Sequence, residues 1–208
     1  MPSRSTRTQI APARALRWLV AAALVLTACS TDDGRTLAPP VLPLPATTAP
    51  ESTLPPEPTL PAPLQVIAPW PDGSEIPIRH TCDGDDLAPA LTWTNVSADA
   101  VELAVTVVDL DAGGFVHWVL YGIDPQRTSL IENELPPPGN ESVNSFGSLG
   151  WSGPCPPLNE RHLYQFTVHA LNQPLVVADE APATEVISML SLIAIDQGAV
   201  SGTFVRTQ

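Results

Sequence analysis

Short runs of β-branched and aromatic residues recur along the C-terminal two thirds of the chain, and turn-forming residues separate them. Runs punctuated in this way are typical of β-strands. Several of them are apolar at both odd and even positions, so we expect both faces of the resulting sheet to be covered. The predicted strands are residues 64–68, 90–94, 102–110, 115–123, 163–171 and 202–206.

One segment near the C-terminus, residues 184–195, repeats its apolar positions with a helical period instead. Thr184 is the predicted N-cap, and Gly198 lies beyond the expected end of the helix. The apolar stripe of this helix consists of Val186, Met189, Leu190 and Ile193. Strands and helices do not alternate along the chain, so we predict a mainly β protein: an antiparallel β-sandwich with a C-terminal helix.

The N-terminus predicts export from the cell. Four arginines precede an apolar run at residues 18–26, which is too short for a comfortable transmembrane span. The sequence Leu-Thr-Ala-Cys at residues 26–29 resembles the lipobox of bacterial lipoproteins. That resemblance implies cleavage before Cys29, lipids on Cys29 and attachment to the extracytoplasmic face of the cell membrane. The alternative is an ordinary secretory signal followed by an incidental cysteine.

The segment after this signal predicts a disordered tether. Ten of the 27 residues at positions 37–63 are proline, which lacks an amide donor and favours extended polyproline II. We therefore expect a signal peptide (1–28), a linker that begins with the lipid-anchored cysteine and is rich in Pro, Thr and Ala (29–63), and one domain (64–208). The 145 residues of the domain suit a single hydrophobic core.

The charge of the chain excludes one class of partner. All nine basic residues are arginines, and four of them lie in the predicted signal peptide. The remaining chain holds five arginines and 22 acidic residues, which gives a net charge of −17. Such a surface repels nucleic acid, so we predict no nucleic-acid partner.

Candidate functional residues cluster in "DLDAGGFVHW", residues 109–118, which contains two carboxylates and an imidazole. Strand alternation predicts one shared face for a set of side chains on this strand: Phe115, His117, Val119 and Tyr121. His162 and Tyr164 likewise share a face at the start of a later predicted strand. We expect these strand ends to meet at one end of the sandwich, where binding loops cluster.

Two acids and two histidines suit several chemistries. Asp109 and Asp111 could simply cap turn amides, and carboxylate oxygens with imidazole nitrogens also suit zinc or manganese. The sequence has no H-E-x-x-H ligand set and no G-x-S-x-G nucleophile elbow. A hydrolase or a metal-dependent enzyme is therefore the less favoured alternative, and we predict no catalytic residue, no metal site and no cofactor.

Four motifs occur in order: "TCDGDDLAPALTW" (81–93), "DLDAGGFVHW" (109–118), "NSFGSLGWSGPCPP" (144–157) and "RHLYQFTVHAL" (161–171). Together they resemble the phosphatidylethanolamine-binding protein family, in its bacterial Raf-kinase-inhibitor-like branch, from about residue 76 onward. The resemblance implies a β-sandwich with C-terminal helical structure. It also implies a small site at one end of the sheet that binds phosphate-like groups and phospholipid headgroups without catalysis. The alternative is inhibition or regulation of a kinase, a protease or another envelope partner through the same pocket, and the sequence identifies no such protein.

The resemblance also implies which residues bind the ligand. Carried over by motif, they are Asp109, Asp111, His117, Gly153, Pro154, His162 and Tyr164. The chain departs from the family in the turn after the first aspartate, where Leu110 and Gly113 replace two prolines and should loosen the turn. Asp86 stands near the pocket where the family usually has Asn, which adds a further negative charge.

An anion beside two aspartates requires positive charge to offset them. A nearby carboxylate raises the pKa of a histidine, and a protonated imidazole donates from both nitrogens. We therefore expect His117, His162 and Tyr164 to meet a phosphate, and the backbone amides at 147–153 to add donors. The ammonium of a zwitterion would meet a carboxylate. Binding should be better below about pH 6.5, the reference pKa of imidazole.

Two cysteines remain beside Cys29, and the family resemblance places both in loops near the pocket. In an exported domain, Cys82 and Cys155 form one possible pair, so we expect a disulfide between them. The alternative is a pair of buried free thiols.

Overall fold

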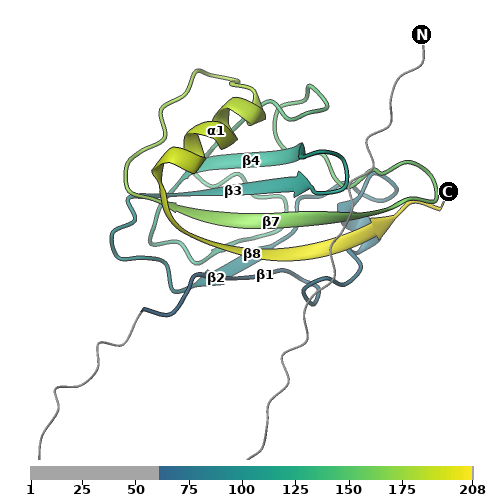
Figure 1. Cartoon of the computed structure of the whole chain (residues 1–208), viewed down its shortest axis with the longest axis horizontal. Helices are drawn as coiled ribbons and strands as arrows, with labels where there is room; N and C mark the ends of the chain where they lie inside the picture. Colours follow the sequence, from purple (N-terminus) through teal and green to yellow (C-terminus); the bar gives the residue numbers. More distant parts are fainter. Residues whose placement is uncertain (1–60, 208) are drawn as a thin grey trace, which may run out of the picture. The chain divides into compact units, whose positions relative to one another are not determined.

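The structure, a computed structural model, describes residues 61–207. The predicted signal peptide, the lipidation site at Cys29 and most of the predicted tether lie outside the described residues. The described part consists of two antiparallel sheets and one C-terminal helix, so the predicted fold class is confirmed (Figure 1).

The larger sheet has five strands in the order β6-β4-β3-β7-β8. They are β3 (Glu102–Asp109), β4 (Phe115–Ile123), β6 (Asn140–Glu141), β7 (Arg161–Leu171) and β8 (Ala194–Val205). The smaller sheet has the order β1-β2-β5 and is built from β1 (Gln65–Ile67), β2 (Leu91–Thr94) and β5 (Ser129–Leu130). The pattern of apolar runs missed β5 and β6, because two residues are too few to show a period.

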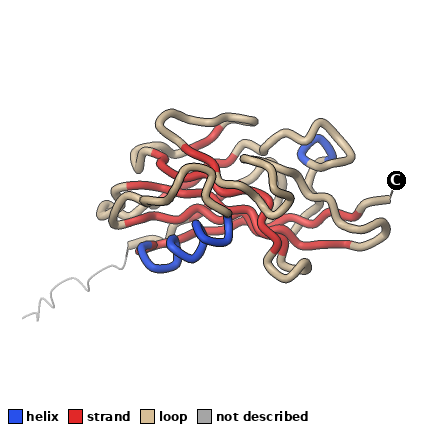
Figure 2. The backbone as a smooth tube through the Cα atoms, turned by 90° about the horizontal axis from the view of Figure 1, so that it is seen from above, coloured by secondary structure: helices blue, strands red, loops and turns tan. Residues whose placement is uncertain are grey.

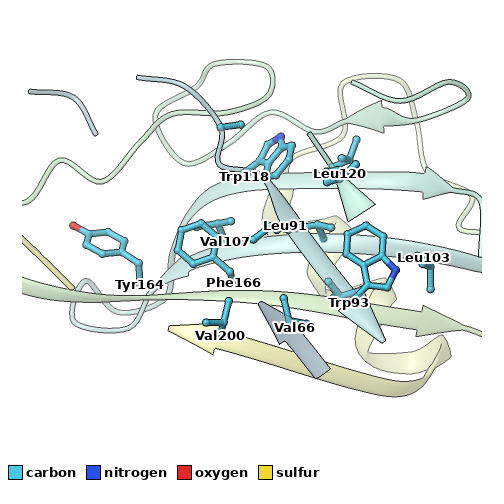
Figure 3. Close-up of a cluster of buried hydrophobic side chains, with 14 of the residues drawn as sticks. Val66, Leu91, Trp93, Leu103, Val107, Trp118, Leu120, Tyr164, Phe166 and Val200 are labelled. Carbon is cyan, nitrogen blue, oxygen red and sulfur yellow. The ribbon is translucent and has the colours of Figure 1, made fainter. Parts of the chain in front are cut away.

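The main hydrophobic core lies between the two sheets. Alternate residues of β7 point into it, and Phe166 is completely buried in the same cluster as Trp93 of β2 and Trp118 of β4. Figure 3 shows Tyr164 at one end of this cluster, with its hydroxyl pointing away from the other labelled side chains. The core therefore ends at the start of β7, where the polar residues of the predicted site begin.

Helix α1 (Ala183–Ile193) covers the other face of the larger sheet (Figure 2). Its buried positions include Val186, Leu190 and Ile193, as the stripe predicted, whereas Met189 is partly exposed. The N-cap is Pro182 and not Thr184, which lies in the first turn. No helix within residues 61–207 is long and apolar enough to cross a membrane.

Gly198 lies beyond the end of the helix, as predicted, but it is not the residue that ends it. Strand β8 begins at Ala194, directly after the helix, and Gly198 lies inside this strand opposite Val168. A Cβ atom at position 198 would lie 2.3 Å from the carbonyl oxygen of Leu64. The glycine is therefore required by a close approach of two backbones and does not end the helix.

Candidate functional site

A β-bulge positions His117. Val107 pairs with Trp118 and Val108 pairs with Val116, so His117 is the extra residue of β4. A bulge changes the alternation of a strand and turns a side chain toward a new face. Val119 and Tyr121 pack beneath α1, so the prediction that they share a face with His117 was wrong.

The bulge directs His117 toward the start of β7. Its ring meets that of Tyr164 edge to face, with the centroids 5.2 Å apart, and lies 5.5 Å from that of Phe115. The predicted neighbourhood of His117 and Phe115 is therefore present, although the rest of the strand follows a different parity.

A cavity of about 210 Å³ opens at this end of the sandwich. It is lined by Asp109, Ala112, Phe115, His117, Phe146, Cys155, Pro156, Pro157 and His162. The structure thus brings together three side chains that the sequence analysis had singled out from three different strands or their ends: Asp109, His117 and His162. Most of the other lining residues are apolar.

Asp109 is buried at the end of β3 and uses both of its carboxylate oxygens. Oδ1 accepts hydrogen bonds from the backbone N–H groups of Asp111 (2.9 Å) and Ala112 (3.0 Å). Oδ2 lies 2.7 Å from Nδ1 of His162. Asp109 therefore caps the turn and also orients an imidazole of the cavity.

His162 lies between two carboxylates. Besides the contact with Asp109, its Nε2 lies 3.5 Å from Oε2 of Glu160. The hydrogen bond from His162 to Asp109 raises the pKa of the imidazole, and this effect outweighs the opposing one of desolvation. His162 is thus the group in the cavity best suited to carry a positive charge near neutral pH.

His117 is buried and has a different environment. Its Nδ1 lies 2.7 Å from the carbonyl oxygen of Ser152, whose own N–H donates to the carbonyl oxygen of His117. Because a carbonyl oxygen can only accept, Nδ1 carries the hydrogen. Burial lowers the pKa of His117, so this imidazole tends to be neutral.

Tyr164 lies behind the two imidazoles. Its ring stacks at 6.4 Å from that of His162, and its hydroxyl is buried without a hydrogen-bond partner among residues 61–207. Burial, with the nearby Asp109 carboxylate as a smaller contribution, raises the pKa of this phenol. An unsatisfied buried hydroxyl is uncommon in native proteins, and this one lies behind the cavity and outside its lining.

Four of the seven predicted ligand-binding residues lie outside the cavity lining: Tyr164, Asp111, Gly153 and Pro154. The carboxylate of Asp111 is on the surface and accepts from the backbone N–H of Leu163 at 2.7 Å. The N–H of Gly153 donates to Oδ1 of Asp86 at 2.7 Å, and the carbonyl oxygen of Pro154 accepts from Cys82. These groups hold the loops around the cavity in place.

The loop amides that were expected to bind an anion are also occupied. The N–H of Gly147 donates to Asn144, that of Gly150 donates to Ser142, and that of Gly153 donates to Asp86. These three donors are therefore already used within the protein.

Sequence reasoning missed the aromatic wall of the cavity. Phe146 lies edge to face with Phe115 (4.7 Å between centroids) and with His117 (5.3 Å). Asn144 shapes the loop that holds Phe146, because its Oδ1 accepts from the Phe146 N–H while its Nδ2 donates to Ser152 Oγ. The only sequence signal was the position of Phe146 inside one of the four motifs.

The expected disulfide between Cys82 and Cys155 is present. Cys155 is part of the cavity wall, and Cys82 belongs to the loop that also contains Asp86. The bond therefore joins the cavity wall to a loop 73 residues earlier in the chain.

His162 is the candidate source of positive charge in the cavity, since His117 tends to be neutral and none of the described lining residues is an arginine. The four arginines of the described part are engaged elsewhere: Arg79 with Glu132, Arg127 with Glu134, Arg161 with Thr203 and Arg206 with Asp83. Within the described part of the chain, three or more His, Cys, Asp or Glu side chains are nowhere grouped to hold a metal ion.

Comparison with known proteins agrees with this geometry. Residues 67–205 match the family described as "Phosphatidylethanolamine-binding protein". A Mycobacterium tuberculosis protein named "Putative lipoprotein LppC" is 37% identical over 146 residues, which cover 68% of this chain and 72% of that protein. A "UPF0098 protein" of Methanothermobacter thermautotrophicus is 34% identical over 142 residues, which cover 65% of this chain and 93% of that protein. The crystal structure of E. coli YbcL, described as a new member of the mammalian PEBP family, matches with a TM-score of 0.65 at 28% identity, covering 69% of this chain and 99% of that chain.

Proposed function

Because the chain belongs to the phosphatidylethanolamine-binding protein family, we propose that its cavity binds a small anionic group, such as phosphate or the phosphoethanolamine headgroup of a phospholipid, without transforming it. The observation that supports this proposal most directly is the position of His162, which lines the cavity and lies between the carboxylates of Asp109 and Glu160. An imidazole held in this way keeps its proton to a higher pH than a free imidazole does, and the imidazolium attracts an anion.

The size and the lining of the cavity limit the ligand. Pockets for drug-sized molecules usually measure ~300–1,000 Å³, whereas this cavity measures about 210 Å³. It therefore suits a headgroup and not an acyl chain.

The same proposal includes a membrane anchor. A signal peptide (1–28) would be removed, Cys29 would carry lipids, and the linker to residue 63 would attach the domain to the extracytoplasmic face of the cell membrane. The lipobox-like sequence supports this arrangement, as does the name of the mycobacterial relative. Labelling with a radioactive fatty acid, compared between the natural chain and Cys29→Ser, would test it.

Binding of phosphoethanolamine should weaken as the pH rises. The hydrogen bond to Asp109 raises the pKa of His162, so the imidazolium is present below this raised value and is lost as the pH passes through it. The change should fall above the reference pKa of about 6.5. Calorimetric titration at about pH 6 and about pH 8.5 should give a severalfold lower affinity at the higher pH.

Two histidine variants test whether the pH dependence of binding comes from His162 or from other titrating groups of the protein. His162→Gln should weaken binding and remove most of its pH dependence. His169→Gln is the matched control, because His169 bonds to Thr106 outside the cavity and burial lowers its pKa to about 4. Equal or tighter binding of phosphoethanolamine at the higher pH would show that imidazolium is not the recognition group.

A further inference from the structure

A second cavity, of about 230 Å³, shares none of its lining residues with the first cavity, the one that contains His117 and His162. Two indole rings and three carboxylates belong to its lining, and none of the described lining residues is basic. Because such a lining repels anions, a charged ligand of this cavity has to be a cation. The cavity is lined by Asp86, Ala88, Trp118, Asn133, Glu134, Leu135, Glu141 and Trp151.

Two tryptophans form a corner of the second cavity. The rings of Trp118 and Trp151 stand perpendicular to each other, with their centroids 5.7 Å apart. Trp118 is almost completely buried, whereas Trp151 is partly exposed and is therefore the ring that a ligand reaches more easily. The face of an indole ring carries partial negative charge and attracts a cation more strongly than the faces of the other aromatic side chains do.

Carboxylates hold the edges of both rings. Nε1 of Trp118 donates to Oε1 of Glu141 at 2.7 Å, and Nε1 of Trp151 donates to Oδ1 of Asp86 at 3.1 Å. Figure 3 shows the indole nitrogen of Trp118 on the side of its ring that faces away from Phe166. The two hydrogen bonds fix the orientation of the indoles before a ligand arrives, and they keep two negative charges beside the rings.

The charges of these two carboxylates are not neutralised within the described part of the chain. Glu134 is paired, because Nη2 of Arg127 lies 2.8 Å from its Oε1 and 2.9 Å from its Oε2. In contrast, no described arginine or histidine forms an ion pair with Asp86 or Glu141. Oδ2 of Asp86 and Oε2 of Glu141 also accept no hydrogen bond from the described residues. A bound cation would supply the missing charge.

We propose that the second cavity binds a small organic ammonium ion, which lies against the indole faces and pairs with the carboxylates of Asp86 and Glu141. The cavity is smaller than the ~300–1,000 Å³ of pockets for drug-sized molecules, so it suits one ammonium group with short substituents. A hard metal ion fits less well, because it needs oxygen ligands where this cavity has two indoles. This inference goes beyond the proposed function, since it concerns other residues and a ligand of opposite charge.

The test compares two probes of the same shape. Choline carries a trimethylammonium group, and 3,3-dimethylbutan-1-ol has an uncharged tert-butyl group in its place. Each is titrated in phosphate-free buffer into the full chain carrying Cys29→Ser, which prevents lipidation, while tryptophan fluorescence is recorded. Choline should change the fluorescence saturably, because two of the five tryptophans line the cavity, and the alcohol should not. Equal saturation by both probes, or none by choline, would overturn the proposal.

Three variants locate the site. Asp86→Asn and Glu141→Gln each remove one charge while keeping an oxygen that accepts from the indole. Each should weaken choline binding about fivefold, the loss expected for one ion pair near a protein surface. Glu160→Gln is the matched control, because Glu160 lies beside His162 at the first cavity, and it should leave choline binding unchanged.

The outcomes distinguish the second cavity from the first. If Glu160→Gln weakened choline binding while Asp86→Asn and Glu141→Gln did not, the ammonium ion would bind at the first cavity and the inference would be wrong. His162→Gln, which should weaken the binding of phosphoethanolamine, should leave choline binding intact, so either proposal can fail without the other. Circular dichroism checks the folding of each variant, and the comparison of the two probes on the chain with its natural cavity residues decides the question even if a variant does not fold.

Discussion

Replacing both Cys82 and Cys155 with serine should lower the free energy of unfolding by about 4 kcal/mol, the value that the chain-entropy relation gives for a loop of this length. The disulfide closes a loop with a sequence separation of 73, and this loop contains β2, β3, β4, β5 and β6. Without the bond the unfolded chain gains conformational freedom, and the folded state gains nothing in return. Urea unfolding followed by tryptophan fluorescence would measure the difference.

Reduction of the natural sequence provides the control for this prediction. In the presence of a strong reductant the natural chain should unfold at the same urea concentration as the double serine variant, because both then lack the bond. Loss of the bond should also disturb the geometry of the cavity, since Cys155 is part of its wall and the bond holds that wall to the loop of Asp86. A change in unfolding free energy of less than about 1 kcal/mol would mean that the unfolded chain is already compact without the bond.

The longer strands were predictable from the sequence because they are long, apolar runs. Strand β3 buries seven of its eight residues and β7 seven of its eleven, between the smaller sheet and helix α1, and a long apolar run of this kind is recognisable without any partner. The structural role of Gly198 was not predictable in the same way. Its role depends on Leu64, which is more than a hundred residues away, and a local pattern contains no information about such a contact.

The candidate site was predictable only in part, for a similar reason. The family resemblance pointed to Asp109, His117 and His162, and the structure brings these three together. The direction of His117 depends on a bulge, which strict alternation of strand residues cannot represent. Asp111 has the same side chain and lies only two residues from Asp109, yet it faces the surface because the turn between them reverses the chain.

This contrast between the two aspartates leads to the second large effect. Asp109→Ala should lower the free energy of unfolding by about 3 kcal/mol, since it leaves a buried imidazole and two turn amides without their acceptor. Asp111→Ala should cost only about 1 kcal/mol, because it removes a single hydrogen bond at the surface. Urea unfolding of both variants at about pH 6 would measure the two values, with the reference pKa of imidazole as the guide to that choice of pH.

The pH dependence of the Asp109 effect provides an independent check. The folded state raises the pKa of His162, so the stability that this pair contributes is fully present below the unfolded value of about 6.5 and is lost as the pH rises through the folded value. The difference between Asp109→Ala and the natural chain should therefore be larger at about pH 6 than at about pH 9. Binding of phosphoethanolamine should be lost in Asp109→Ala and retained in Asp111→Ala, because only the first substitution removes the group that keeps His162 charged and oriented. If the two variants behaved alike, the carboxylate of Asp109 would not organise the cavity, and its contact with His162 would be incidental to binding.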